Sequence, residues 1–207
     1  MKTRIIPANS LDAITRAIEI LHSGGLVAFP TDTVYGLGAL AFKGKAVESI
    51  YAAKGRPIEK AIPILIGDQG DLEKVGTNIP ESAHTLASRF WPGPLTVLVP
   101  KRADLPEAVS ATATVGVRVP DHAVARALLR AAGPLAVTSA NISGRESPVT
   151  APEVYEELGG RIALIVDGGR TPGGVPSTLV DCTTPELSIL REGPISMEEL
   201  LSTLNTS

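Results

Sequence analysis

Apolar residues recur along the chain at two spacings, and these spacings predict alternating helices and strands. Apolar positions three and four residues apart predict a first helix that Ser10 caps and that the glycine pair 24–25 ends. A second helix is predicted to end at Pro57, which leaves Lys54 and Arg56 at its carboxyl end, where cations complement the free carbonyl groups. The same spacing predicts four more helices, at residues 81–90, 123–131, 152–158 and 197–204.

Short apolar runs between these helices predict strands. The run at residues 26–29 stops at Pro30, which cannot continue a ladder, and the polar residues 31–33 follow as a turn. Further runs predict strands at residues 62–66, 95–99, 115–119, 135–138, 163–166, 178–180 and 187–190. Because strands and helices interleave throughout, we expect an α/β fold, with one domain over residues 1–207 and helices flanking a twisted, largely buried mixed sheet. The pattern does not give the strand order.

Composition narrows the classes of function. The 207 residues are 43% hydrophobic and can bury a full core, while a net charge of −3 gives no overall field that would gather polyanions. Tight sequence-specific DNA binding is therefore not expected. The single cysteine, Cys182, excludes an intramolecular disulfide, and no apolar stretch approaches the roughly 18 residues that a membrane span needs. We predict a cytoplasmic protein without a signal peptide or membrane contact.

Polar residues gather where apolar strands end, which is where ligands bind in open α/β sheets. Lys54 and Arg56 could hold a polyphosphate or a carboxylate, or they could be solvated cations at a helix end. Arg118 interrupts an apolar strand, and either a ligand or an internal salt bridge would offset its burial. Ser139 and Asn141 could hold a ligand or cap a turn. The residues alone leave these alternatives open.

Several familiar motifs are missing from the sequence. It has no G-x-x-x-x-G-K-[ST], G-x-G-x-x-G, H-E-x-x-H or G-x-S-x-G motif, so a bound nucleotide would need another cradle. The histidines His22, His84 and His122 share no motif with a nucleophile, and we expect solvated or capping roles for them. Cys182 is expected to be a small packed residue. Trp91 is expected to fill the core beneath a turn.

Seven segments, in this order and spacing, resemble the YrdC/Sua5 family. They are FPTDTVYGLG at 29–38, AKGRP at 53–57, WPGPLT at 91–96, VRVP at 117–120, SANISG at 139–144, GVPST at 174–178 and LREG at 190–193. Each segment is a weak signal alone, but seven in register over residues 10–200 are not a chance match. The resemblance implies a YrdC/RibB-like fold in its short form, without the C-terminal extension of longer members.

The resemblance also implies an activity. Members of the family are L-threonylcarbamoyladenylate synthases, nucleotidyltransferases that convert ATP, L-threonine and bicarbonate to threonylcarbamoyl-AMP, pyrophosphate and water. The product serves the modification of adenosine 37 in ANN-decoding tRNAs. The implied partners are the downstream threonylcarbamoyl-transferase machinery and, at most through a weak contact, tRNA. Mg²⁺ is expected with ATP as co-substrate, held by ATP and water more than by protein ligands. The alternative is an RNA-binding relative without robust synthase activity.

Site residues follow from the resemblance position by position. A tetrad implied to be catalytic consists of Lys54, Arg56, Ser139 and Asn141. Implied contacts to ATP are Arg56, Lys60, Thr114, Ser139, Ser147 and Arg191. Implied contacts to threonine are Thr33, Arg118, Val137 and Ser177, with Arg118 facing the carboxylate. Leu65 stands where many members have a histidine near threonine and others an aliphatic residue.

Overall fold

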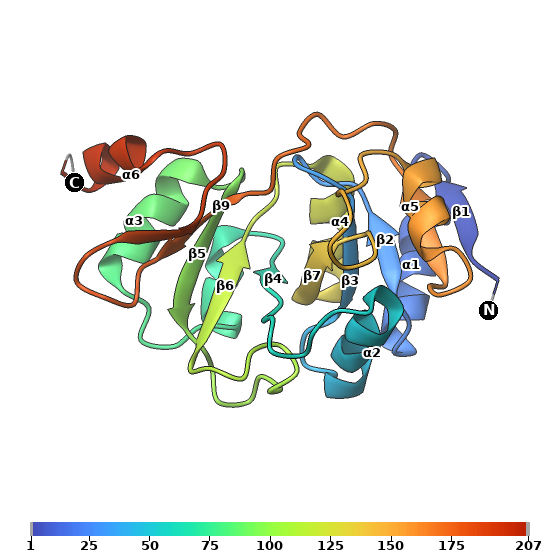
Figure 1. Ribbon diagram of the computed structural model, residues 1–207, viewed down its shortest axis with the longest axis horizontal. Helices are drawn as coiled ribbons and strands as arrows, with labels where there is room; N and C mark the ends of the chain where they lie inside the picture. The colour runs from blue at the N-terminus through green and yellow to red at the C-terminus, as the bar shows by residue number, and fades with distance from the viewer. Residues whose placement is uncertain (1, 206–207) are drawn as a thin grey trace.

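A single mixed sheet runs through the computed structural model, which describes residues 2–205 (Figure 1). Within that range the strand order is β1-β8-β2-β3-β7-β4-β6-β5-β9-β10. The strands are β1 (Arg4–Pro7), β2 (Val27–Phe29), β3 (Gly36–Leu40), β4 (Ile64–Leu65), β5 (Leu95–Pro100), β6 (Thr114–Arg118), β7 (Leu135–Ser139), β8 (Leu164–Asp167), β9 (Thr178–Asp181) and β10 (Ser188–Arg191). Parallel and antiparallel pairings occur along the sheet, which confirms the predicted mixed α/β fold. Residues 1, 206 and 207 of the predicted domain lie outside the described range.

Helices cover both faces of the sheet. They are α1 (Ala13–His22), α2 (Gly44–Lys54), α3 (Glu81–Phe90), α4 (Ala123–Ala132), α5 (Ala151–Leu158), α6 (Met197–Asn205) and the 3₁₀ helix η1 (Gln69–Lys74). Alternate residues of a strand point to opposite faces, so Val27 and Phe29 pack with α1 and α4, whereas Ala28 packs in the larger cluster on the other face. Figure 1 shows β1 and α5 at one end of the long axis, and α3 and α6 at the other.

Two of the helix ends predicted from capping residues differ from the structure. Ser10 does not cap α1, which begins at Ala13. The helix ends at His22, and the glycine pair closes it as predicted, because Gly24 adopts φ +86° and the amides of both glycines donate to carbonyls of the last turn. Residue 10 instead takes part in a turn after β1, where its amide donates to the carbonyl of Pro7. The second helix ends at Lys54 rather than at Pro57, because Gly55 adopts the left-handed conformation, with φ +59°, that closes a helix.

Three elements were not predicted, namely β1, β3 and η1. The edge strand β1 is mostly exposed and lacks a long apolar run. β3 contains Gly36 and Gly38, and glycine is depleted in strands. Glycine is needed there, because a Cβ on Gly36 would lie 2.7 Å from Cγ1 of Val137 on the neighbouring strand. The predicted strand at 62–66 has only two residues in the ladder, Ile64 and Leu65.

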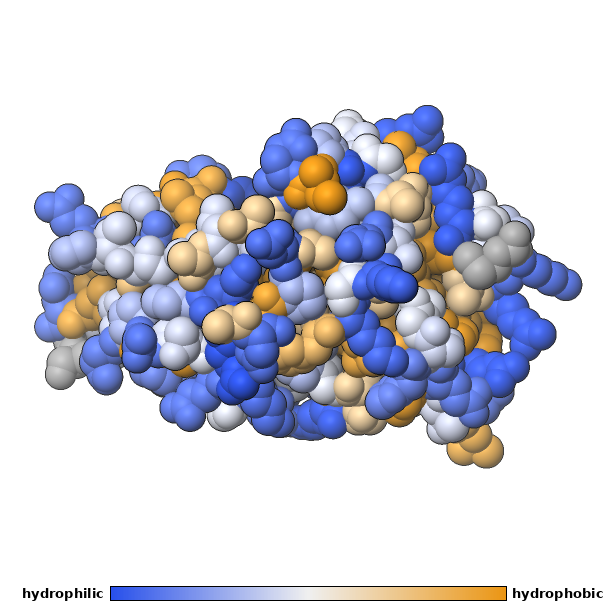
Figure 2. All heavy atoms as spheres, turned by 90° about the horizontal axis from the view of Figure 1, so that it is seen from below, coloured by the Kyte–Doolittle hydropathy of each residue, from blue (hydrophilic) through white to orange (hydrophobic). Residues whose placement is uncertain are grey.

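The surface is consistent with a helix-covered sheet. In the view of Figure 2, hydrophilic side chains cover most of the face and apolar groups lie between them in smaller areas. No helix within residues 2–205 is long and apolar enough to cross a membrane.

A pair of leucine substitutions tests the packing. Leu128 of α4 is fully buried against the sheet, while Leu11 is fully exposed before α1. We expect Leu128→Ala to lower the free energy of unfolding by about 2–5 kcal/mol, since it removes buried surface and leaves a cavity. The matched Leu11→Ala should change it by less than about 0.5 kcal/mol. Urea denaturation measures both, and equal effects would contradict the packing of α4 against the sheet.

Candidate active site

Arg118, the last residue of β6, is buried and ion-paired. Its Nη2 lies 2.5 Å from Oδ1 of Asp32, Nη1 donates to Oγ1 of Thr33 at 3.1 Å, and Nε donates to the carbonyl of Gly93 at 2.9 Å. The amide of Gly93 in turn donates to the carbonyl of Val119, so this end of β6 is fixed from both sides. Of the two interpretations open from sequence, the internal salt bridge is present, and it places the predicted Thr33 and Arg118 in direct contact.

The turn between β2 and β3 holds Asp32 and Thr33 in place. Oγ1 of Thr31 accepts from the amide of Thr33 at 3.1 Å and donates to the carbonyl of Val34 at 2.7 Å. From outside the turn, the amide of Gly174 donates to the carbonyl of Thr33 at 3.1 Å. Gly173 approaches so closely that a Cβ there would lie 2.4 Å from that same carbonyl oxygen. The turn is therefore clamped between its own hydroxyl and the 171–176 loop.

Lys54 is buried at the end of α2 and bonds to the main chain after β7. Its Nζ donates to the carbonyls of Ser139 and Asn141, while its own carbonyl accepts from the amide of Ser143 at 2.9 Å. Burial lowers the pKa of Lys54 to about 8; the neighbouring charge of Arg56 also lowers it, and Glu157 acts in the opposite direction. The cation is thus held by neutral carbonyl oxygens, and no carboxylate within residues 2–205 forms a salt bridge with it.

Arg56 and Arg191 are also held by carbonyl groups. Arg56 donates to the carbonyls of Lys60 at 3.1 Å and of Ala61 at 2.9 Å. Arg191 donates from Nε and Nη2 to the carbonyl of Ser177, at 3.0 and 2.8 Å, and from Nη2 to its hydroxyl at 2.9 Å. In both cases carbonyl groups fix the direction of the guanidinium, and no carboxylate in the described part of the chain pairs with it.

The four cations lie within electrostatic reach of one another. The charge of Arg56 lowers the pKa of Lys54 and of Arg191, and Arg191 lowers that of Arg118. Burial is the largest cause of the lowered pKa in Lys54, Arg56, Arg118 and Arg191 alike. Among the residues from 2 to 205, a carboxylate directly contacts Arg118 alone of these four cations. Lys54 and Arg118 are buried and Arg56 is half-buried, whereas Arg191 is exposed. An excess of positive charge that is partly withdrawn from water is costly unless an anion offsets it, so this cluster is suited to bind a polyanion.

Asn141, whose main-chain carbonyl accepts from Lys54, carries a side-chain acceptor that is unpaired within residues 2–205. Its Nδ2 donates to the carbonyls of Ile142 and Arg145, at 2.9 and 2.8 Å, whereas its Oδ1 is buried and has no partner within residues 2–205. A buried acceptor without a donor costs free energy, and a bound donor group would remove that cost. Glu157 steadies this loop by accepting from the amide of Ile142 at 2.9 Å.

The remaining predicted residues lie around these contacts. The exposed Lys60 follows Arg56, and Ser147 precedes Pro148, whose carbonyl accepts from the amide of Tyr35. Val137 lies two residues before Ser139 on β7, against Gly36. Thr114 is at the far end of β6 from Arg118, about 13 Å away at the rise of an extended strand.

Leu65 pairs in register with Arg118 and is buried in the cluster beneath α1 and α4. An apolar side chain there is accounted for by packing.

Three expectations for isolated residues can be compared with the structure. Trp91 is buried and its Nε1 donates to the carbonyl of Leu95, which confirms its place in the core. Cys182 is buried as well, and burial raises the pKa of its thiol to about 12. His122 is at the cap position of α4, but its side chain makes no cap bond and its Nδ1 is buried without a partner within the described range.

Sequence reasoning missed Asp32 as a site residue. It stands between two predicted turn residues directly after a strand, and this position was the one signal that could have found it.

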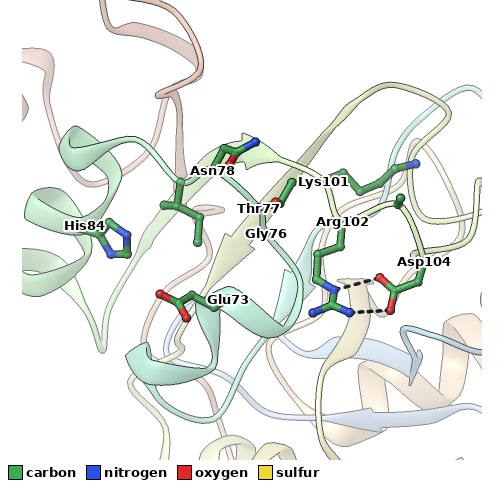
Figure 3. A pocket seen from close by; sticks show the side chains of 10 residues that line it. Glu73, Gly76, Thr77, Asn78, His84, Lys101, Arg102 and Asp104 are labelled. Atoms are coloured by element: carbon green, nitrogen blue, oxygen red, sulfur yellow. Dashed lines mark hydrogen bonds and ion pairs between the residues drawn. The ribbon is translucent and has the colours of Figure 1, made fainter.

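A separate hollow of about 800 Å³ opens at the other end of β5 from Gly93 (Figure 3). Glu73, Asn78, His84 and Lys101 are among its lining residues. Arg102 also lines the hollow, and its guanidinium donates two hydrogen bonds, of 2.9 and 2.8 Å, to the carboxylate of Asp104. Because that charge is already compensated, the hollow lacks the excess positive charge of the four-cation cluster.

Comparisons with known proteins place the chain among its relatives. Residues 19–193 match the Sua5/YciO/YrdC family model, whose description is "Telomere recombination". The chain is 46% identical over 190 residues to the "Threonylcarbamoyl-AMP synthase" of Bacillus subtilis, covering 90% of this chain and 55% of the relative. It is 41% identical, with a TM-score of 0.92, to the P. abyssi Sua5 structure complexed with L-threonine, covering 99% of this chain and 61% of that one.

The structure of E. coli YciO matches at full length. Its TM-score is 0.84 at 28% identity, covering 97% of this chain and 100% of that one. By contrast, the chain spans about half the length of the curated Bacillus and Pyrococcus relatives, 55% of each.

The lowered pKa of Lys54 can be measured directly. In lysine-labelled protein, we expect one side-chain NMR resonance to titrate near pH 8, and Lys54→Arg should abolish it. Added pyrophosphate should raise that pKa, because a nearby anion favours the charged form. Between pH 8 and 10.5 the unfolded chain holds a proton that folded Lys54 does not, so this group makes the free energy of unfolding rise with pH. A midpoint unaffected by pyrophosphate would place Lys54 outside an anion site.

Proposed function

This chain belongs to the Sua5/YciO/YrdC family, and we propose that it is an L-threonylcarbamoyladenylate synthase. The main observation in support is a set of four cations, held by carbonyl groups, of which Lys54 and Arg118 are buried and Arg56 is half-buried. Within residues 2–205 one carboxylate, that of Asp32, pairs with this set. ATP and an amino acid together bring the phosphate and carboxylate anions that such a set would bind. The name of the Bacillus relative and the L-threonine bound to P. abyssi Sua5 indicate the reaction.

The proposed reaction has two steps. The ammonium group of L-threonine first gives up a proton to solvent. The resulting amine and bicarbonate then form a carbamate and release water. A carbamate oxygen then attacks the α-phosphorus of ATP, the bond to the β-phosphate oxygen breaks, and pyrophosphate leaves. Negative charge moves onto phosphate oxygens during the second step, so fixed cations facing them stabilise the transition state. Lys54, Arg56 and Arg191 suit that role, and it makes the enzyme a nucleotidyltransferase.

The roles of individual residues are part of the proposal. Ser139 and Asn141 complete the catalytic tetrad, with the unpartnered Oδ1 of Asn141 as an acceptor for the ligand. Lys60, Thr114 and Ser147 contact ATP, and the length of β6 is compatible with an extended nucleotide reaching from Thr114 toward Arg118. The threonine contacts are Thr33, Arg118, Val137 and Ser177.

Mg²⁺ enters as part of its complex with ATP. No three His, Cys, Asp or Glu side chains gather into a metal site within residues 2–205. The phosphates and water are therefore its proposed ligands.

The proposed use of the product is the modification of adenosine 37 in tRNA by a downstream transferase in the cytoplasm.

An RNA-binding relative without synthase activity is not favoured. Its binding would rest on phosphate contacts by a broad basic surface, and the chain has a net charge of −3. Two cations of the site, Lys54 and Arg118, are instead buried.

Pyrophosphate release tests the reaction. We expect purified protein with MgATP to release pyrophosphate only when both L-threonine and bicarbonate are present, because the attacking oxygen belongs to their carbamate. A coupled phosphate assay in bicarbonate-depleted buffer measures this. Release that is independent of either substrate would rule out the synthase.

Two arginines provide a matched test of the cluster. Arg56→Gln should lower kcat/KM for ATP by about 100-fold or more, the usual loss when a donor to a developing anion is removed. Arg102→Gln removes the same charge from an exposed ion pair at the other end of β5 and should change kcat/KM by less than about twofold. Both variants should keep the wild-type circular dichroism spectrum. Equal losses in the two would show that net charge, and not the site, matters.

A further inference from the structure

The ion pair between Arg118 and Asp32 has unused bonding capacity on both sides. Arg118 donates from three of its five N–H groups to residues 2–205, which leaves one proton on each of Nη1 and Nη2. Asp32 accepts from Arg118 through Oδ1 only, and its Oδ2 has no hydrogen-bond partner in the described part of the chain. The pair is mostly buried, with side-chain exposures of 6% for Arg118 and 12% for Asp32.

A buried ion pair normally gains from satisfying its remaining donors and acceptors. In this pair the unused donors of Arg118 and the unused acceptor of Asp32 lie next to each other, so a cation and an anion face the same ligand. A free α-amino acid carries the same two charges, with a carboxylate and an ammonium group on neighbouring atoms. It can therefore lie against the pair with its carboxylate on Arg118 and its ammonium on Asp32, so that each charge meets its opposite.

We propose that Asp32 binds the ammonium group of the amino-acid substrate and, with Arg118, makes the site specific for an unmodified zwitterion. This inference rests on the proposed function, because it assigns a residue to the same threonine site. Asp32 is well placed for the role, since the turn that carries it is fixed by Thr31 and by Gly174. A rigid carboxylate loses little conformational freedom on binding.

The competing role for Asp32 is simple neutralisation of Arg118. The two roles predict effects of opposite sign. If Asp32 only neutralises the guanidinium of Arg118, it competes with the substrate carboxylate for that group. Removing the charge of Asp32 should then tighten threonine binding. If Asp32 binds the ammonium group, its neutralisation should weaken threonine binding while leaving or improving the binding of a carboxylate that has no ammonium.

The experiment uses calorimetric titration of the whole protein with L-threonine and with N-acetyl-L-threonine, which keeps the carboxylate and lacks the ammonium. Wild type should bind L-threonine about tenfold or more tighter than the acetylated form, since a charge-assisted hydrogen bond is lost with the ammonium. Asp32→Asn should weaken L-threonine binding by about 10- to 100-fold and remove this preference. Asp32→Glu should retain it. Thermal denaturation verifies that each variant is folded.

The matched control is Asp121→Asn. Asp121 is exposed and lies one residue before His122, so the variant removes the same charge without touching Arg118. Its L-threonine affinity should stay within about twofold of wild type. Unchanged or tighter binding of L-threonine by Asp32→Asn overturns the inference, as does equal binding of the two ligands by wild type. Wild type that binds L-threonine but releases no pyrophosphate would refute the synthase and leave the inference standing.

Discussion

Four positive charges are fixed by carbonyl oxygens, and much of the architecture serves that arrangement. Carbonyl groups orient a cation without neutralising it, so the field of Lys54, Arg56 and Arg191 remains available to a ligand, whereas Arg118 is also paired with Asp32. The cost appears as a lowered pKa in all four groups, with burial as the leading cause. The remaining core must supply enough stability to hold this repulsive group together. Two apolar clusters on opposite faces of the sheet provide it.

The sheet brings these cations together from distant parts of the sequence. Arg118 is the last residue of β6, and its partner Asp32 lies in the turn between β2 and β3. In the sheet order β3 and β6 are three positions apart, with β7 and β4 between them. β3 also pairs with β7, and this places the turn beside the loop that receives Lys54. Gly36 makes that pairing fit, since Val137 occupies the space where a Cβ would be.

The local pattern of apolar residues was sufficient to predict most helices and strands, but it did not predict the contacts between them. α3 was predicted with its observed bounds because its apolar spacing is regular, and β5 differs at one end only. β3 was missed because packing against Val137 demands glycine where strand propensity disfavours it. From the sequence it was not possible to decide whether Arg118 binds a ligand or forms a salt bridge. Its partner Asp32 is 86 positions away, and periodicity is a local signal. The family pattern grouped the site residues, but Asp32 emerged only from the geometry.

The way Lys54 is held has a consequence for how this site tolerates sequence change. Its partners are the main-chain oxygens of Ser139 and Asn141, and those oxygens exist whatever side chains stand at the two positions. The lysine is therefore positioned by the path of the chain, which the side-chain amide of Asn141 helps to fix through the carbonyls of Ile142 and Arg145. A change of side chain at residue 139 leaves both acceptors of the lysine in place, whereas an insertion or deletion between β7 and Ser143 would disturb both at once.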